Sequence, residues 1–226
     1  MSRDIHDQYT APTPAIESDH PAVAEFAARH AGEARSDIER AVRLYYAVRN
    51  SIRYDPYRID LSLSGMRASA TLRSGRGWCV SKAVLLAACC RSSGIAARLG
   101  FADVRNHLST ARLRERMRTD IFYWHGYTEM LLDGRWVKAT PAFNIELCER
   151  FNLLPLEFDG RNDSLYHPFD ATGQRHMEYV NHRGVYTDLP LQEIIQTFQK
   201  EYGFSGPSPE LERASFDEDV ESETRP

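Results

Sequence analysis

One cysteine stands where a glycine-rich turn meets an apolar helix. Cys79 follows the turn Gly75–Trp78 and precedes a run of apolar residues that ends near Ser92. The first turn of a helix has unpaired backbone N–H groups and a partial positive charge, and both favour a thiolate over a thiol. Arg73 and Arg76 add positive charge nearby. These residues predict a nucleophile at Cys79 if a base lies close to it, the alternative being a small buried residue at a helix start.

The base for this thiol has to come from among eight histidines, and His125 stands out by its position. It lies near the start of an alternating, aromatic-rich segment, Phe122–Leu132, that predicts a strand. Side chains alternate between the two faces of a strand, so His125 can face a cleft while its neighbours pack. Gly126 leaves room for another backbone to approach closely. The alternative is a core histidine that is bonded to a backbone carbonyl.

The composition of the chain argues against several other classes of protein. Its 226 residues are 42% hydrophobic and carry a net charge of −4, which allows a substantial core, whereas a general nucleic-acid-binding protein should be basic. No apolar run approaches the roughly 18 residues of a membrane helix, and Met1–Tyr9 lacks the apolar region of a signal peptide. The four cysteines show neither disulfide nor zinc spacing. We expect a cytoplasmic protein without metal, cofactor, nucleic acid or membrane.

The spacing of apolar residues predicts the elements that position Cys79 and His125. Helices are expected over 21–30, 36–52, 79–92, 190–202 and one turn at 144–150, and strands over 95–101, 122–132, 135–139 and 174–180. Residues 57–77 are expected to form a loop, and residues 103–120 an exposed segment or a short helix. Helices followed by an antiparallel sheet indicate an α+β domain over 21–202. An irregular arm at 1–20 precedes it, and an acidic, disordered tail at 203–226 follows.

The cysteine and histidine segments together resemble the transglutaminase-like superfamily, and in particular its small bacterial members. The resemblance covers residues 35–145 and rests on Ser74-Gly75-Arg76-Gly77-Trp78-Cys79, the apolar helix after it, the run Arg91–Arg98, and His125 leading a strand. It implies a papain-like core in which the cysteine-bearing helix packs on an antiparallel β-sheet. It also implies that Cys79 is the nucleophile and His125 the base. Residues 146–202 would then be a C-terminal elaboration of this core.

One position departs from the pattern of that superfamily. Its members usually carry a Trp-x-x-x-Asp-Pro-Thr segment on the second hairpin strand, and the aspartate orients the histidine. Here the segment is Trp136-Val137-Lys138-Ala139-Thr140-Pro141, so Thr140 falls in the place of the aspartate. A threonine hydroxyl can accept a hydrogen bond from the ring but carries no charge to stabilise an imidazolium. Thr140 is the expected third member and Asn144 the alternative, and three carboxylates elsewhere stay open: Asp133, Asp159 and Asp170.

The implied chemistry is acyl transfer through a thiol. Cys79 would attack an amide or ester carbonyl of a peptide, protein or small amide, with the backbone N–H of Cys79 facing the oxyanion. His125 would carry the proton, and water (protease or amidase) or an amine (transglutaminase) would resolve the acyl-enzyme. One rival is an arylamine N-acetyltransferase, although its Arg-Gly-Gly-x-Cys signature is not matched by Arg76-Gly77-Trp78-Cys79. The other rival is a non-catalytic binding module that keeps the fold.

Aromatic residues adjoin both chemical residues in the sequence. Trp78 precedes Cys79 and Trp124 precedes His125, so each could wall a substrate cleft, with core packing as the alternative. The segment Leu153–Gly184 lies beyond the family core and is rich in aromatic and charged residues. We expect it to close over the site and to set substrate choice.

Overall fold

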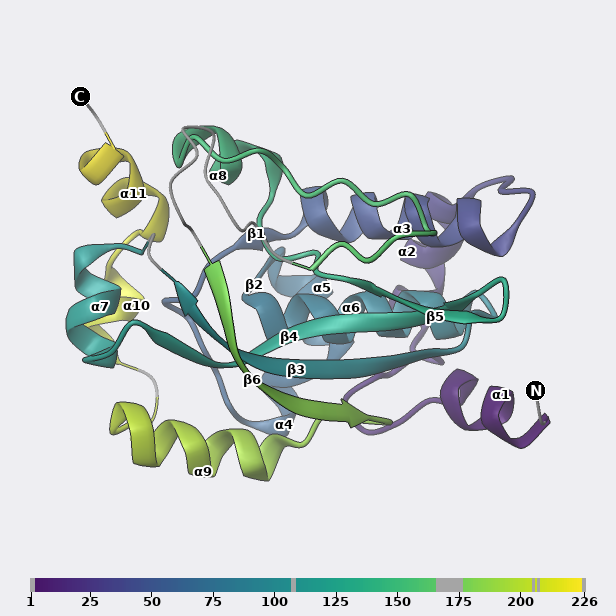
Figure 1. The fold of residues 1–226 in the computed structure, drawn as a ribbon, viewed down its shortest axis with the longest axis horizontal. Helices are drawn as coiled ribbons and strands as arrows, with labels where there is room; N and C mark the ends of the chain where they lie inside the picture. Colours follow the sequence, from purple (N-terminus) through teal and green to yellow (C-terminus); the bar gives the residue numbers. More distant parts are fainter. Residues whose placement is uncertain (1–2, 107–108, 166–176, 205, 207, 225–226) are drawn as a thin grey trace.

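The core of the protein is an antiparallel sheet of four strands with a buried helix against it (Figure 1). The computed structural model describes residues 3–106, 109–165, 177–204, 206 and 208–224. The strand order is β5-β4-β3-β6, so the two strands at the centre are β4 and β3. The strands span Ala97–Asn106 (β3), Ile121–Leu132 (β4), Arg135–Ala139 (β5) and Met177–Tyr186 (β6). A separate parallel pair joins β1 (Arg53–Tyr54) to β2 (Arg76–Gly77).

Helix α6 (Cys79–Ser92) is the central helix of the fold. Every residue from Cys79 to Arg91 is buried, as expected for a helix that is apolar all round. It packs against β3 and β4, and α2, α3 and α5 surround it. Lys82 is fully buried in this helix, and its ammonium donates hydrogen bonds to the carbonyls of Arg49 and Ile52 at the end of α3. The start of α6 is therefore fixed against the end of another helix.

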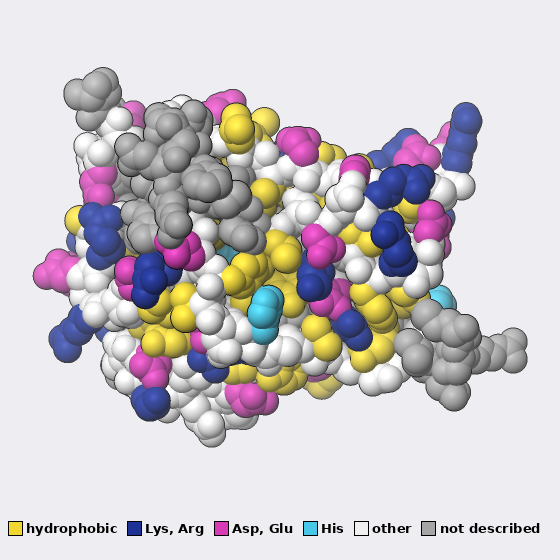
Figure 2. Space-filling model, viewed as in Figure 1, with side chains coloured by type: hydrophobic (Ala, Val, Ile, Leu, Met, Phe, Trp, Pro, Cys, Tyr) yellow, Lys and Arg dark blue, Asp and Glu magenta, His cyan; other side chains and the backbone are white. Residues whose placement is uncertain are grey.

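The remaining helices cover this core from several sides (Figure 1). Their bounds are Arg3–Thr10 (α1), Pro21–Ala31 (α2), Asp37–Ser51 (α3), Leu63–Met66 (α4), Ala68–Ser74 (α5), Ala111–Met117 (α7), Ile145–Arg150 (α8), Leu191–Tyr202 (α9), Pro209–Arg213 (α10) and Phe216–Thr224 (α11). Helices α7, α10 and α11 gather at one end of the molecule, on the left in Figure 1. Figure 2 shows apolar side chains over the centre of the sheet face, between charged side chains of both signs near the two ends.

The predicted α+β fold is confirmed, with differences in its shorter elements. The helix at Cys79, the 36–52 helix and the hairpin β4–β5 lie where the apolar spacing places them. The expected arm at 1–20 contains α1, and the expected loop at 57–77 contains α4 and α5. The strand expected at 174–180 continues to Tyr186, and its first residues lie outside the described part of the chain. Helices this short depend on contacts with the rest of the fold, which a local pattern does not contain.

The C-terminal segment also differs from the expectation. Residues 203–226 are expected to be a disordered acidic tail, whereas the structure has two helices there, α10 and α11. Phe216 and Val220 are buried in the core, at 5% and 0% exposure. The acidic side chains of α11 meet arginines that lie far away in the sequence, so their charge is compensated only in the folded chain.

Candidate active site

The thiol of Cys79 lies at the first residue of α6 and is 6% exposed. Ser81 stabilises this helix start, because its hydroxyl accepts the backbone N–H of Trp78 at 3.1 Å. Burial raises the pKa of the Cys79 thiol to about 11, against an opposing effect of backbone N–H groups from Gly126, Val80 and Cys79 itself that point at the sulfur. The helix start therefore offers the expected donors, but burial outweighs them. A thiolate at this position needs a proton acceptor beside it.

The imidazole of His125 can accept this proton, and it lines the same cavity as the Cys79 thiol. His125 is 4% exposed on β4 and, together with Cys79, lines an apolar cavity of about 40 Å³. The other walls are Tyr54, Pro56, Ile59, Trp78, Leu113, Met117, Phe122, Tyr123, Phe198 and Tyr202. The sequence-predicted nucleophile and base are thus brought together by the packing of α6 on β4.

A bulge in β4 sets the position of His125. Ala102 on β3 pairs with His125 and Val104 pairs with Phe122, so two residues of β4 stand opposite Asp103 alone. The second of them, Trp124, has a φ of 60°, a left-handed conformation that is costly for a bulky residue. The buried carboxylate of Asp103 accepts the backbone N–H of Trp124 at 3.1 Å. The bulge therefore places a strained residue next to His125 and holds it with a hydrogen bond.

The carboxylate of Asp103 is itself fixed by two side chains of β6. Arg183 donates to Oδ1 through Nε at 2.6 Å, and Asn181 donates to Oδ2 at 3.4 Å. The guanidinium of Arg183 also lies over the Trp124 ring, 4.7 Å from its centre. Asp103 was not identified from the sequence, because a single acid inside a strand gives no pattern that marks its partners.

Gly126 allows β4 to approach α6 at the nucleophile. A Cβ at this position would lie 2.9 Å from the Cα of Val80, which is closer than real Cβ atoms come, and 3.3 Å from its Cγ2. The predicted close backbone approach at Gly126 is therefore present, and the backbone it meets is that of the residue after Cys79. This contact brings the backbone N–H of Gly126 to the Cys79 sulfur.

Thr140 lines a cavity that also contains His125 but does not include Cys79. This second cavity of about 10 Å³ is also lined by Ala142, Phe143, Leu156, Leu165 and Met177. The backbone of Thr140 donates to the Ser164 carbonyl, and its hydroxyl has no hydrogen-bond partner among the described residues. Thr140 thus reaches the same cavity as the imidazole, while its role as the third member stays a prediction.

The other candidates for the third member are engaged elsewhere. Asn144 is the N-cap residue of α8, and its side chain accepts the N–H of Tyr54 at 3.0 Å and donates to the Glu146 carboxylate at 2.7 Å. Asp133 lies in the exposed β4–β5 turn, where it pairs with Arg161 at 3.8 Å. Asp159 accepts backbone N–H groups in its own turn, which lowers its pKa to about 2. Asp170 lies outside the described residues.

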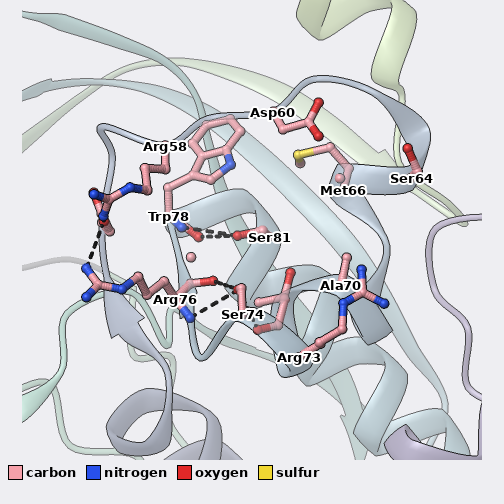
Figure 3. A pocket seen from close by; sticks show the side chains of 14 residues that line it. Arg58, Asp60, Ser64, Met66, Ala70, Arg73, Ser74, Arg76, Trp78 and Ser81 are labelled. Carbon is pink, nitrogen blue, oxygen red and sulfur yellow. Dashed lines mark hydrogen bonds and ion pairs between the residues drawn. The ribbon is translucent and has the colours of Figure 1, made fainter. Parts of the chain in front are cut away.

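Trp78 separates the thiol cavity from a larger one whose lining includes several charged side chains. This larger cavity measures about 390 Å³, and its 14 lining residues lie within the segments 55–66 and 70–81 (Figure 3). Arg58 and Arg76 both pair with the buried Asp55, at 3.0 and 3.2 Å. Figure 3 shows the Trp78 indole between Arg58 and Asp60. The expectation that Trp78 walls a cleft agrees with this position, since it lines both cavities.

Trp124 lies elsewhere. Its indole donates to Thr197 of α9 at 2.9 Å, and its ring contacts Phe101 and Tyr186. It does not line the cavity that holds Cys79 and His125. The structure thus assigns Trp124 to the packing alternative that its sequence position left open.

Two aromatic residues of α9 are site residues that the sequence analysis missed. Phe198 and Tyr202 lie one helical turn apart and both line the thiol cavity. Tyr202 accepts the N–H of Tyr123 at 2.7 Å and donates to the Ile121 carbonyl at 3.0 Å, which ties α9 to the start of β4. Their helical spacing can be read from the sequence, but the sequence does not show that this face of α9 packs over the start of β4.

The expected closing segment, Leu153–Gly184, is described in part. Leu156, Leu165 and Met177 line the small cavity beside His125 and Thr140. Its aromatic run from Tyr166 to Asp170 lies outside the described residues. Its part in substrate choice stays a prediction.

Comparison with known proteins identifies the family and the fold. Residues 24–141, about half of the chain, match the transglutaminase-like superfamily, and the chain belongs to that superfamily. The structure is similar to one described as a "putative cysteine protease" from Cytophaga hutchinsonii, with a TM-score of 0.51 and 18% identity. That match covers 83% of this chain and 48% of the other, so this chain spans about half the length of its neighbour. At this identity the likeness establishes the fold.

A second solved structure shows a weaker likeness. It is described as a "putative protease" from Parabacteroides distasonis ATCC 8503, with a TM-score of 0.37 and 16% identity over 55% of this chain and 25% of that one. A search of curated proteins gave no match. Within the described ranges, no helix has the length and apolar character needed to cross a membrane. The described side chains also include no group of three or more His, Cys, Asp or Glu placed to hold a metal ion.

Proposed function

We propose that the protein is a cysteine-dependent enzyme that cleaves an amide or ester bond through an acyl-enzyme on Cys79. The observation that carries the proposal is the convergence of three features on one cavity: the thiol, the His125 imidazole, and backbone N–H groups at the start of α6. A nucleophile, a proton carrier and oxyanion donors are the parts that acyl transfer requires. The family of the chain and the protease description of its structural neighbour favour a peptide or protein substrate.

The first half of the reaction forms the acyl-enzyme. His125 takes the proton of the Cys79 thiol, and the sulfur attacks the carbonyl carbon to form a tetrahedral intermediate. The backbone N–H of Cys79 stabilises the negative oxygen, with the neighbouring N–H of Gly126 as a second donor on the same side. The carbon–nitrogen or carbon–oxygen bond then breaks, and His125 gives its proton to the leaving group. A thioester on Cys79 and a free amine or alcohol result.

The second half releases the acyl group. His125 takes a proton from water, whose oxygen attacks the thioester carbonyl, and the carbon–sulfur bond breaks to return the thiol and a carboxylic acid. An amine in place of water would give a new amide by the same steps. The raised pKa of the Cys79 thiol makes His125 essential in the first half, because the thiol alone does not ionise near neutral pH. We propose that the 390 Å³ cavity beyond Trp78 holds a part of the substrate that flanks the bond.

An activated ester tests this proposal directly. p-Nitrophenyl acetate should give a burst of p-nitrophenol equal to one acetyl group per protein, and peptide mapping by mass spectrometry should place that group on Cys79. Cys79→Ser and His125→Gln should abolish or slow the burst at least 100-fold, whereas Cys89→Ala, a matched change in the same helix, should keep it. Adding a primary amine to the acyl-enzyme then separates transfer from hydrolysis. A burst that is unchanged in Cys79→Ser would contradict the proposal.

A further inference from the structure

The cavity at Cys79 is closed to a substrate of the proposed kind. Its volume of about 40 Å³ is far below the roughly 300 Å³ at which ligand pockets begin, and Cys79 is buried. Leu113 and Met117 of α7 form part of its wall, as does Tyr54. One or more of these walls must move before an acyl donor reaches the sulfur.

The C-terminal segment, residues 208–224, lies against these walls, and we refer to it as the C-terminal clasp. A cavity of about 50 Å³ adjoins the thiol cavity and shares five of its walls: Pro56, Ile59, Met117, Phe198 and Tyr202. Ser208 and Leu211 of the clasp close the far side of that cavity. The clasp therefore lies one layer outside the active site, next to α7 (Figure 1).

Ion pairs hold helix α11 of the clasp to basic side chains of the body. Asp217 pairs with Arg150 at 2.9 Å and also with Arg53. Asp219 pairs with Arg112 of α7 at 2.8 Å and accepts the Tyr57 hydroxyl at 2.8 Å. Both carboxylates are about one-fifth exposed, so solvent screens these pairs only in part.

A third carboxylate of α11 meets the start of α7. Glu223 accepts the backbone N–H of Ala111 at 2.9 and 3.0 Å and pairs with Arg114 at 3.8 Å. The clasp thus contacts α7 at two points: the Arg112 side chain and the backbone N–H of Ala111, the first residue of α7. Because α7 is a wall of the thiol cavity, the clasp fixes that wall.

An aromatic side chain anchors the clasp between the charges. The Phe216 ring lies 5.2 Å from that of Tyr57 and 5.8 Å from that of Tyr54, which lines the thiol cavity. The centre of the Phe151 ring lies 6.5 Å from that of Phe216. The body of the protein therefore offers a surface that combines arginines with an aromatic slot, immediately beside the nucleophile.

We propose that this surface, formed by Arg53, Arg112, Arg150, Tyr54 and Tyr57, docks an acidic peptide segment with an aromatic anchor, and that the C-terminal clasp is its resident, inhibitory occupant. Five acids and no base lie between Ser215 and Thr224, which matches the charge of the surface. Release of the clasp from this surface frees α7 and opens the cavity at Cys79. This inference rests on the proposed function for its meaning, but its test reads access to the thiol and not catalysis.

Alkylation of the full-length protein by iodoacetamide measures that access, with each cysteine followed by peptide mass spectrometry. Asp217→Asn together with Asp219→Asn should label Cys79 about tenfold faster than the wild type at low salt, which equals about 1.4 kcal/mol in the opening equilibrium. Each single substitution should give a smaller increase. Raising NaCl from 0.05 to 0.5 M should speed labelling of the wild type more than that of the double variant, because salt screens the ion pairs.

Two controls separate opening of the clasp from other effects. Glu218→Gln removes the same charge from the adjacent residue of α11, an exposed side chain with no ion pair among the described residues, and should leave the rate unchanged. Cys89 and Cys90 are fully buried further along α6 and report global unfolding. Two results would overturn the proposal that the clasp closes the cavity. One is an equal rise in the labelling rates of Cys89 and Cys79 in the double variant, and the other is a rise in Cys79 labelling in Glu218→Gln as large as that in the double variant.

A peptide added in trans tests the docking surface. The peptide of residues 215–224 should slow Cys79 labelling of the double variant back toward the wild-type rate. The same peptide with Phe216→Ala and with its acids changed to amides should have no effect. Equal behaviour of the two peptides would contradict the docking surface. If the clasp variants open as expected but show no acyl-enzyme, the proposed function fails while this inference stands.

Discussion

Replacing Gly126 by alanine should separate the nucleophile from its base by a small, definite amount. The new Cβ would lie 2.9 Å from the Cα of Val80, about 0.6 Å inside the roughly 3.5 Å at which carbon atoms pack. The atom it meets is backbone, so α6 and β4 must move apart instead of a side chain turning away. The moving part of α6 includes Cys79, the residue before Val80.

The magnitude follows from this displacement. Overpacking of a close contact costs about 1–3 kcal/mol of stability, and a misplacement approaching 1 Å costs up to about 100-fold in rate. The donation from the Gly126 N–H to the sulfur is weakened by the same shift. We expect Gly126→Ala to fold with a reduced midpoint in urea and to form the acyl-enzyme about 10- to 100-fold more slowly.

The assay compares this variant with Gly94→Ala, which lies just beyond the other end of α6. Gly94 has a φ of 79° with open space around it, so alanine there costs stability through backbone strain and not through a clash. Both variants should lose stability in urea unfolding, and only Gly126→Ala should lose the p-nitrophenol burst. Equal rates in the two variants would refute the reasoning that Gly126 sets the distance between α6 and β4.

Three further predictions follow from the site and the core. Asp103→Asn keeps an acceptor for the Trp124 N–H but leaves Arg183 without its carboxylate. We expect the free energy of unfolding in urea to fall by about 1–3 kcal/mol and the pH profile of acylation to change. An unchanged pH profile would show that Asp103 has a structural role alone. Thr140→Asp places a carboxylate in the cavity beside His125 and should raise the acylation rate at pH 6 about tenfold, whereas Thr140→Val should not. Equal acylation rates in the two variants would exclude position 140 as the residue that orients His125. Burial raises the pKa of Tyr45 and Tyr57 above the ordinary phenol value and that of Cys148 to about 11, so the folded state holds these protons longer than the unfolded chain. The melting temperature should therefore be insensitive to these groups below about pH 8.5 and fall as pH rises beyond it, and a melting temperature that rises between pH 9 and pH 11 would contradict this.

The parts of the site that could be predicted from the sequence are those marked by the pattern of neighbouring residues. Cys79 follows a glycine turn before an apolar run, and His125 with Gly126 lies near the start of an alternating strand, so the local pattern predicts both residues. Family resemblance then directed attention to Thr140. The confirmed fold follows from the same patterns, because α6 is a long apolar run and an Asp-Gly turn signal joins the two strands of the β4–β5 hairpin.

The parts that could not be predicted depend on contacts between distant segments. Asp103 acts through Trp124 and Arg183, which lie 21 and 80 residues away, and no local pattern connects them. Helix α11 has the composition of a disordered tail until Arg53 and Arg112 neutralise it. The raised pKa of Cys79 has the same origin, since the residues around the thiol come from five separate segments of the chain.

The pairing of Cys79 with His125 is the central claim, and the pH dependence of Cys79 alkylation tests it most directly. In the wild type, Cys79 should react nearly as fast at pH 6 as at pH 8, because His125 holds the proton and leaves a thiolate. In His125→Gln the reactivity at pH 6 should vanish, and the rate should rise only toward alkaline pH, since burial raises the pKa of the isolated thiol to about 11. Identical profiles for the two proteins, both rising only toward alkaline pH, would contradict the account.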